Sequence, residues 1–162
     1  MGASAEKSQL IFDTGSTWLV VASSKCSNCG GSVYTVDNSK ISDSAELNIK
    51  YGSANLNGIQ VHDKVCVGDY GASSSSLCLD DFKFVAISSQ EGLSPSKGIF
   101  GLGPYNKNDD NPHKAFIPEL FTNGKITQNK VSFAMGYTLK GSSTPSFADF
   151  GEPDDTYYTG EL

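Results

Sequence analysis

Residues 10–21, LIFDTGSTWLVV, place a single acid, Asp13, between two apolar runs. Burying an ionised carboxylate costs several kcal/mol unless it is paired or hydrogen-bonded. Thr14, Gly15 and Ser16 directly after it supply two hydroxyls, a backbone free to turn and amide donors. An isolated Asp-Thr-Gly is usually only a turn, but a turn between exposed strands does not need apolar residues on both sides. The pattern therefore predicts a carboxylate held in a partly buried loop.

The composition favours a fold built from short strands. The 162 residues are enough for one domain with a sizeable core. The 17 glycines, the serine-rich stretches and the scarcity of helical apolar repeats predict strands joined by turns. We therefore expect one all-β domain over residues 1–162, with one or two short helices.

The alternation of apolar and polar residues places the individual elements. Two strands are expected around Asp13, and a β-hairpin is expected at residues 45–67 with a polar tip at 53–57. The glycine-punctuated stretch GIFGLGP indicates close backbone approach rather than a helix. The expected strands, loop and helix are, in chain order, strands 9–13 and 18–22, the hairpin 45–67, a loop at 69–76, strand 77–88, the GIFGLGP stretch 98–104, a helix at 113–123, and strands within 130–137 and 146–154.

The charge pattern excludes two classes of partner. All 12 basic residues are lysines, against 18 acids, and the net charge is −6. Nucleic acids and anionic membranes are bound by basic patches, so we expect neither as a partner. No apolar run approaches the ~20 residues needed to cross a bilayer. Residues 1–9 do not resemble a signal peptide, so the chain is expected to be a mature or shortened product.

The four cysteines fall into two close pairs, Cys26 with Cys29 and Cys66 with Cys78. Two local disulfides in an oxidising compartment are the natural interpretation, although four cysteines permit three connectivities. The alternative is a zinc site, but the eleven residues between Cys66 and Cys78 are far from a tight zinc knuckle.

Other familiar sites are missing from the sequence. His62 and His113 stand 51 residues apart in polar surroundings, which is typical of exposed or hydrogen-bonded histidines. There is no G-x-S-x-G elbow and no phosphate-binding loop. Residues 105–113, YNKNDDNPH, lack the ligand spacing of a calcium loop. No metal and no cofactor are therefore expected.

Several motifs, in order along the chain, resemble the N-terminal lobe of the pepsin-like aspartic peptidases. IFDTGSTWLVV (11–21) resembles the family's first catalytic loop, CSNC (26–29) its small disulfide loop, and LNIKYGSANLNG (47–58) its flap, a hairpin that closes over the substrate. GIFGLG (98–103) resembles the segment packed behind the catalytic loop, and VSFAMGY and residues 147–162 resemble strands near the end of the lobe. The resemblance covers almost the whole chain and implies a pepsin-like lobe.

The resemblance also implies roles for individual residues. Asp13 would be one of two catalytic aspartates that share a proton, because two carboxyl groups in contact cannot both ionise cheaply. Thr14 would hold the opposing loop, Gly15 would let the backbone approach the carboxylate, and Ser16 would hydrogen-bond it. The residues expected to contact substrate are, on the flap, Tyr51, Gly52 and Ser53 and, in the pocket before the cut bond, Ile11 and Ile99. Without the resemblance, Tyr51 would be a half-buried strand aromatic, and both isoleucines would be core residues.

The sequence departs from the family pattern at both ends and at several positions. Residues 1–8 stand in place of the family's opening strands, and the sequence ends before the family's crossing into the second lobe, so a lobe truncated at both ends is expected. Only one Asp-Thr-Gly is present, so a second lobe or a second copy must supply the other aspartate. Val20 stands where a tryptophan is usual, and Lys97 stands where an aspartate is frequent. We expect one lobe of an endopeptidase that cuts peptides or unfolded proteins in an acidic, oxidising place: outside the cell, or in a lysosome or vacuole. The alternatives are a homodimer resembling retroviral peptidases, and a non-catalytic lobe that binds peptides or is only structural.

Overall fold

The computed structural model describes residues 1–2, 4–31, 33–68, 77–93, 96–104, 115–136, 138–139 and 142–160. The described chain forms two compact units, residues 1–116 and residues 117–162. The loop expected at 69–76 and the calcium-like stretch at 105–113 lie outside the described residues. The expectation of one domain over the whole chain stays a prediction.

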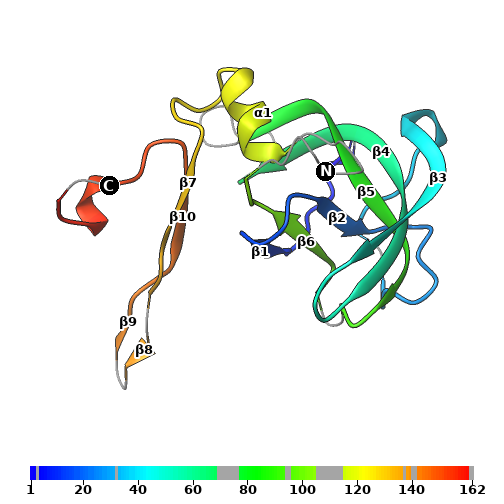
Figure 1. Cartoon of the computed structure of the whole chain (residues 1–162), viewed down its shortest axis with the longest axis horizontal. Helices are drawn as coiled ribbons and strands as arrows, with labels where there is room; N and C mark the ends of the chain where they lie inside the picture. The colour runs from blue at the N-terminus through cyan, green and yellow to red at the C-terminus, as the bar shows by residue number, and fades with distance from the viewer. Residues whose placement is uncertain are drawn as a thin grey trace. The chain divides into compact units, whose positions relative to one another are not determined.

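The first unit is built on a six-stranded mixed sheet (Figure 1). The strands lie in the spatial order β1-β6-β2-β5-β4-β3. Their bounds are β1 Ile11–Asp13, β2 Leu19–Ala22, β3 Ile41–Lys50, β4 Asn55–Val67, β5 Leu77–Glu91 and β6 Gly98–Gly101. β1 pairs with β6 and β2 with β5 in parallel, and the other neighbours are antiparallel.

The apolar runs on either side of the Asp-Thr-Gly turn have different positions in this sheet. Every residue of β2 and of β6 is buried, because β2 lies between β6 and β5 near the middle of the sheet. β1 forms the edge of the sheet, and its residues Ile11 and Phe12 are 51% and 44% exposed. Asp13 is therefore the last residue of an edge strand.

The predicted hairpin is present, with a shorter tip than expected. β3 and β4 are antiparallel, and Lys50 pairs with Asn55 across the turn. The tip is therefore residues 51–54, and the prediction of 53–57 was two residues late at its start and three residues late at its end. Cross-strand pairing continues to Asn55, so the polar residues Asn55 and Asn57 mark the half-buried polar face of a strand rather than a loop.

Both predicted disulfides are formed. Cys26 is bonded to Cys29, and Cys66 is bonded to Cys78. Cys66 and Cys78 are directly opposite residues of β4 and β5, so this bond ties the two longest strands together. The sulfur atoms are bonded to one another and do not form a zinc site. Among the described residues there is also no group of three or more histidine, cysteine or acidic side chains that could hold a metal.

The second unit contains shorter elements. Helix α1, Phe116–Thr122, begins at the boundary of the two units and is the only α-helix in the described ranges. It confirms the expected helix, although His113 is not among the described residues. The unit's two hairpins pair β7 with β10 and β8 with β9. Their bounds are Val131–Ala134, Phe147–Phe150, Thr138–Leu139 and Ser142–Ser143, and the short 3-10 helices are η1 Asn38–Lys40 in the first unit and η2 Asp155–Tyr157 in the second.

The predicted all-β class is confirmed, since strands make up most of the regular structure in the described chain. Within the described ranges, no helix is both long and apolar enough to span a bilayer.

Candidate active site

The Asp-Thr-Gly turn folds back on its own carboxylate. The backbone N–H of Gly15 donates to Asp13 Oδ1 at 2.9 Å. The backbone of the same turn is held from behind: Leu102 N–H donates to the carbonyl of Asp13, and Gly103 N–H donates to the carbonyl of Ser16, both at 2.8 Å. These bonds fix the position of the carboxylate at the end of β1.

The glycines of GIFGLG allow this close approach. A Cβ atom on Gly101 would lie 2.5 Å from the carbonyl carbon of Thr17, and one on Gly103 would lie 2.8 Å from the carbonyl oxygen of Thr14. Real Cβ atoms essentially never come so near to backbone. The expectation of close backbone approach in this stretch is thus confirmed, and its target is the Asp-Thr-Gly turn.

The turn and the tip of the β3–β4 hairpin open onto one cleft of about 670 Å³. The sequence predicted six of its lining residues: Asp13, Thr14, Gly15, Ser16, Tyr51 and Gly52. Two segments about 35 residues apart in the chain therefore face the same space. In this arrangement, a molecule bound at the Asp13 carboxylate would also contact the hairpin tip.

Tyr51 is half-buried, and its hydroxyl oxygen is inaccessible to solvent. Burial raises the pKa of the Tyr51 hydroxyl to about 12; the contact with the Ser16 side chain opposes this shift, and the charge of Asp13 adds to it. Within the described chain, neither the Tyr51 nor the Ser16 hydroxyl makes a hydrogen bond of good geometry, although both are buried. Ser16 therefore contacts Tyr51, and the expected hydrogen bond from Ser16 to Asp13 is not formed in this structure.

Three of the expected substrate-contacting residues do not line the cleft. Ser53 is exposed at the hairpin tip. Ile11 and Ile99 are paired neighbours in β1 and β6, and Ile99 is buried in the apolar core beside the cleft. Their contact with substrate stays a prediction.

The sequence analysis missed other lining residues, namely Thr17, Trp18, Ile49, Lys50, Gly103 and Pro104. The available signal was their position, since each lies within five residues of a predicted site residue. Trp18 is the chain's single tryptophan, and it is 8% exposed.

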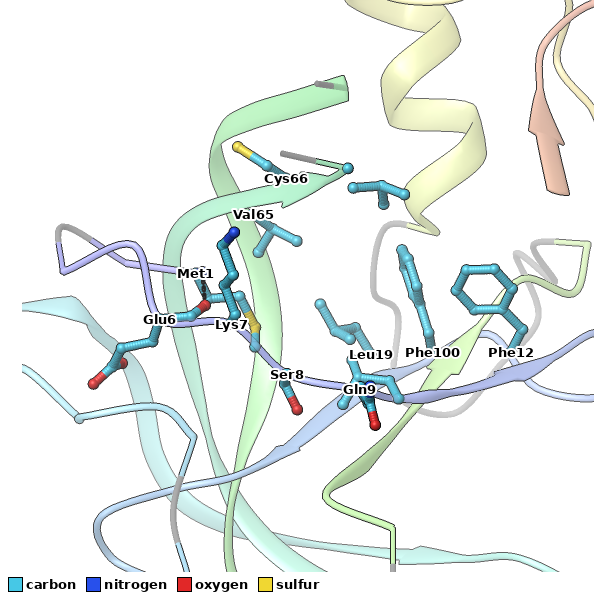
Figure 2. A pocket seen from close by; sticks show the side chains of 13 residues that line it. Met1, Glu6, Lys7, Ser8, Gln9, Phe12, Leu19, Val65, Cys66 and Phe100 are labelled. Atoms are coloured by element: carbon cyan, nitrogen blue, oxygen red, sulfur yellow. Dashed lines mark hydrogen bonds between the residues drawn. The ribbon is translucent and has the colours of Figure 1, made fainter. Parts of the chain in front are cut away.

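Two of the three apolar residues directly before Asp13 line a second cavity, of about 560 Å³ (Figure 2). Leu10 and Phe12 line this cavity, whereas Asp13 lines the cleft, because side chains alternate along a strand. The ring of Phe12 packs edge-to-face on Phe100 at 5.7 Å between centroids. The strand thus has an apolar side and a side that presents the carboxylate.

Comparison with known protein families identifies the family of the chain. The family model described as eukaryotic aspartyl protease matches residues 1–162, the full chain. The chain belongs to this family. The recognition of a pepsin-like aspartic peptidase from the motifs is therefore confirmed.

Among curated members of the aspartyl protease family, three relatives resemble the chain over its full length. They are vacuolar protease A of Aspergillus fumigatus (29% identical), polyporopepsin of Irpex lacteus (28%) and pepsin A of Sus scrofa (29%). The chain spans 41%, 46% and 42% of their respective lengths, which is less than half of each.

A solved structure has the same fold. The aspartic proteinase from Irpex lacteus matches 99% of this chain with a TM-score of 0.75 and 23% sequence identity. The match covers 45% of that protein. At this identity, the likeness establishes the pepsin-like fold alone.

Proposed function

We propose that this chain supplies one half of the active site of an aspartic endopeptidase, with Asp13 as its catalytic carboxylate. The observation that carries the proposal is the shared cleft, in which Asp13 and the hairpin residues Tyr51 and Gly52 face each other. Membership of the aspartyl protease family supports the reaction class. The chain's span of under half of its relatives supports the need for a second carboxylate from outside it.

In the proposed reaction, peptide hydrolysis needs one carboxylate and one carboxylic acid. The ionised group accepts a proton from water, the water oxygen attacks the peptide carbonyl carbon, and the protonated group donates its proton to the carbonyl oxygen. The tetrahedral intermediate collapses when the amine nitrogen takes the proton that the first group gained from water and leaves, while a hydroxyl of the intermediate gives its proton to the second group. Asp13 takes one of these parts and the second lobe's aspartate takes the other.

The surrounding residues hold Asp13 and cover the substrate. The Gly15 N–H fixes one oxygen of Asp13, so its other oxygen is directed to water or to the partner carboxylate. Thr14 holds the opposing loop, and Ser16 contacts the flap tyrosine, Tyr51. Residues 51–53 close over a peptide, and Ile11 and Ile99 contact the apolar side chain before the cut bond.

The proposed substrates are peptides or unfolded proteins with apolar residues at the cut. The two disulfides support an oxidising compartment, either secreted or lysosomal or vacuolar. One relative is named as a vacuolar protease, in line with the last of these.

The test is hydrolysis of an unfolded protein near pH 4 by the full-length gene product. Asp13→Asn keeps the shape of the side chain and removes its acid, so we expect the rate to fall by more than about a thousandfold. Asp81→Asn is the matched control, since Asp81 has a 78% exposed side chain on β5 and does not line the cleft. Equal rates for Asp13→Asn and the unmodified protein would refute the catalytic assignment.

The mass of the protein in solution separates two ways of supplying the partner carboxylate. A monomer that contains a second Asp-Thr-Gly or Asp-Ser-Gly supports the two-lobe enzyme. A stable dimer of this chain alone supports the homodimer instead. Peptide binding that survives Asp13→Ala, with no hydrolysis by any assembly, would identify a non-catalytic lobe.

A further inference from the structure

The turn closed by Cys26–Cys29 continues the edge of β2 along strand β5. Ala22 pairs with Ile87 in the sheet, and beyond this pair the Ser23 hydroxyl donates to the carbonyl of Ile87 at 2.8 Å. The N–H of Ser27 then donates to the carbonyl of Ser88 at 3.1 Å. The disulfide turn thus lies beside the last residues of β5.

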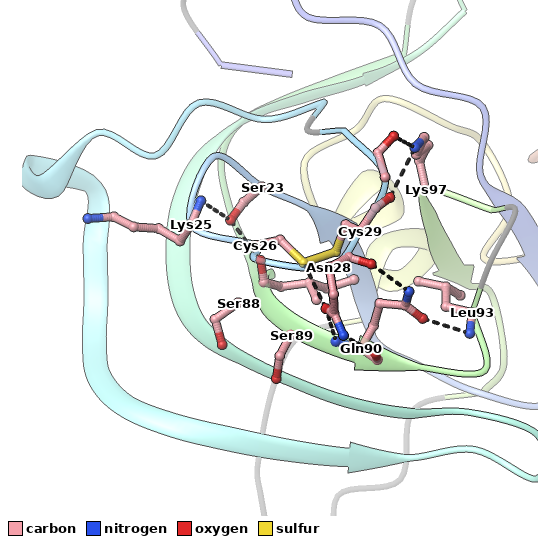
Figure 3. Close-up of a disulfide and its surroundings, with 12 residues drawn as sticks. Ser23, Lys25, Cys26, Asn28, Cys29, Ser88, Ser89, Gln90, Leu93 and Lys97 are labelled. Atoms are coloured by element: carbon pink, nitrogen blue, oxygen red, sulfur yellow. Dashed lines mark hydrogen bonds between the residues drawn. A yellow bond between two sulfur atoms is a disulfide. The ribbon is translucent and has the colours of Figure 1, made fainter.

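Asn28, inside this turn, forms a reciprocal hydrogen-bonded pair with Gln90 (Figure 3). The Asn28 amide nitrogen donates to the carbonyl of Gln90 at 2.7 Å, and the Gln90 N–H donates to Asn28 Oδ1 at 2.9 Å. The Gln90 side chain donates to the carbonyl of Asn28 at 3.0 Å and accepts from Leu93 N–H at 2.9 Å. We call these four bonds the Asn28–Gln90 clasp. It joins segments 62 residues apart.

The clasp lies next to the flap hairpin. On its other edge, Gln90 is paired with Leu56 of β4, at the start of the strand that follows the flap tip. Two residues further, Gly92 has φ +82°, and a Cβ there would lie 2.1 Å from the carbonyl oxygen of Ser53. The end of β5 and the residue after it therefore contact the flap tip and the first residues of β4.

Apolar packing joins the same parts. The disulfide cysteines and Tyr51 pack against one buried cluster, which includes Trp18, Leu56 and Leu93. The remaining members of the cluster are Val20, Ala54, Val85, Ile87 and Ile99. A shift of the disulfide turn would therefore loosen the packing behind Tyr51.

Lys97 adds a second tie to the same turn. Its ammonium group donates to the carbonyls of Cys29 at 3.0 Å and Gly30 at 2.6 Å. Its carbonyl accepts from Ala22 N–H at 2.7 Å. A lysine suits this position because carbonyl oxygens at the end of a turn attract a cation. The turn is thus held on two sides, by Gln90 and by Lys97.

We propose that Asn28 and Gln90 are positioning residues for the flap: their clasp holds the disulfide turn as a support behind the hairpin that carries Tyr51. The proposal rests on the proposed function in one respect only, the role of this hairpin in covering substrate. The mechanical part, from clasp to flap, is independent of catalysis and is tested first.

The direct readout is hydrogen exchange of the Tyr51 amide, which donates to the carbonyl of Ala54 at 2.7 Å. Asn28→Ala removes two clasp bonds, and Asn28→Asp keeps the acceptor but removes the donor to Gln90. The matched control is Asn123→Asp, which removes a similar 2.8 Å bond from an asparagine amide to a backbone carbonyl after α1. Fluorescence of Trp18, the single tryptophan, reports packing in the cluster.

We expect Asn28→Ala to speed Tyr51 exchange about tenfold, Asn28→Asp to have a smaller effect of the same sign, and Asn123→Asp to leave it unchanged. Gln90→Ala removes the other two clasp bonds, so it should also speed Tyr51 exchange. Trp18 emission should shift in the Asn28 variants only. If Asn28→Ala does not fold, Asn28→Asp decides the question alone. Unchanged Tyr51 exchange in a folded Asn28 variant would overturn the proposal, even if the Gln90 amide exchanges faster.

Kinetics of the full-length enzyme then test the link to substrate. A loosened cover should raise KM several-fold while kcat stays within about twofold. If Tyr51 exchange rises and KM is unchanged, the clasp supports the hairpin but the hairpin does not cover substrate. That result would count against the proposed function and leave the mechanical inference standing.

Discussion

The two ends of strand β4 are held in different ways. At the start, Leu56 is fully buried in an apolar cluster and paired with Gln90, which the clasp joins to the disulfide turn. At the other end, Cys66 is covalently bonded to Cys78 in β5. Two polar contacts lie on the same pair of strands: a 2.6 Å contact between His62 Nδ1 and Asp81 Oδ1, and an ion pair of Lys64 with Asp80 at 2.8 Å.

This difference in how the two ends of β4 are held fits their proposed roles, since only the start of β4 adjoins the flap tip. Packing and hydrogen bonds can break and reform on the timescale of substrate entry, whereas a disulfide cannot. The start of β4, next to the flap tip, is thus joined to its neighbours by reversible contacts, since Cys26–Cys29 closes its own turn and does not reach β4, whereas a covalent bond joins β4 to β5 at the other end. The following experiments test whether the two ends are independent.

The largest effect is expected from shortening a buried leucine at each end: Leu56 of β4, and Leu79 of β5, which is paired with Val65 near the other end of β4. Leu56→Ala and Leu79→Ala should each lower the free energy of unfolding by about 3–4 kcal/mol, because both side chains are nearly inaccessible. Denaturant unfolding measures this loss. In native conditions, Leu56→Ala should also speed Tyr51 exchange beyond the change that global unfolding explains, and Leu79→Ala should not. Equal local effects would show that the two ends are coupled.

Removing each disulfide gives the next largest effect. Replacing Cys66 and Cys78 by serine should lower the free energy of unfolding by about 3 kcal/mol, because this bond closes the longer loop. Replacing Cys26 and Cys29 should lower it by about 2 kcal/mol. Only the second change should loosen the flap, seen as faster Tyr51 exchange and altered Trp18 emission. A loosened flap in the variant without Cys66–Cys78 would contradict the independence of the two ends of β4.

The smallest effect is expected in alkali. The pKa of Tyr51 is raised to about 12 in the folded chain from an ordinary 10.0, so the unfolded chain loses this proton first. The resulting stability is complete below pH 10 and is lost as the pH rises through about 12. Solvent screening keeps the effect small because Tyr51 is only partly buried. The fall in Tm between pH 9.5 and 11.5 should therefore be slightly smaller for Tyr51→Phe than for the unmodified chain. An identical fall would mean that the Tyr51 hydroxyl is solvated.

The sequence was sufficient for the elements with strong local signals. The apolar runs on both sides of Asp13, the alternation at residues 45–67 and the spacing of the cysteines predicted strands, a hairpin and two disulfides that the structure contains. Glycines in GIFGLG predicted a close approach, but not its partner. The hairpin tip was misplaced because Asn55 and Asn57 are turn formers by composition and strand residues by pairing.

The parts that the sequence did not predict depend on contacts between distant segments. The Asn28–Gln90 clasp joins a turn and a strand end whose proximity follows from the pairing of β2 with β5. The contact of Ser16 with Tyr51, in place of a bond from Ser16 to Asp13, depends on where the hairpin tip lies. Residue type and spacing do not predict these two contacts, because the contacts depend on how distant segments pack in the folded chain.

The most direct test of the central claim, that Asp13 is one member of a carboxyl pair, is the pH dependence of kcat/KM for the full-length protein. One group must be ionised and the other protonated, so we predict a bell-shaped profile in acid, absent from the residual activity of Asp13→Asn. A bell-shaped profile that persists unchanged in Asp13→Asn would contradict the account.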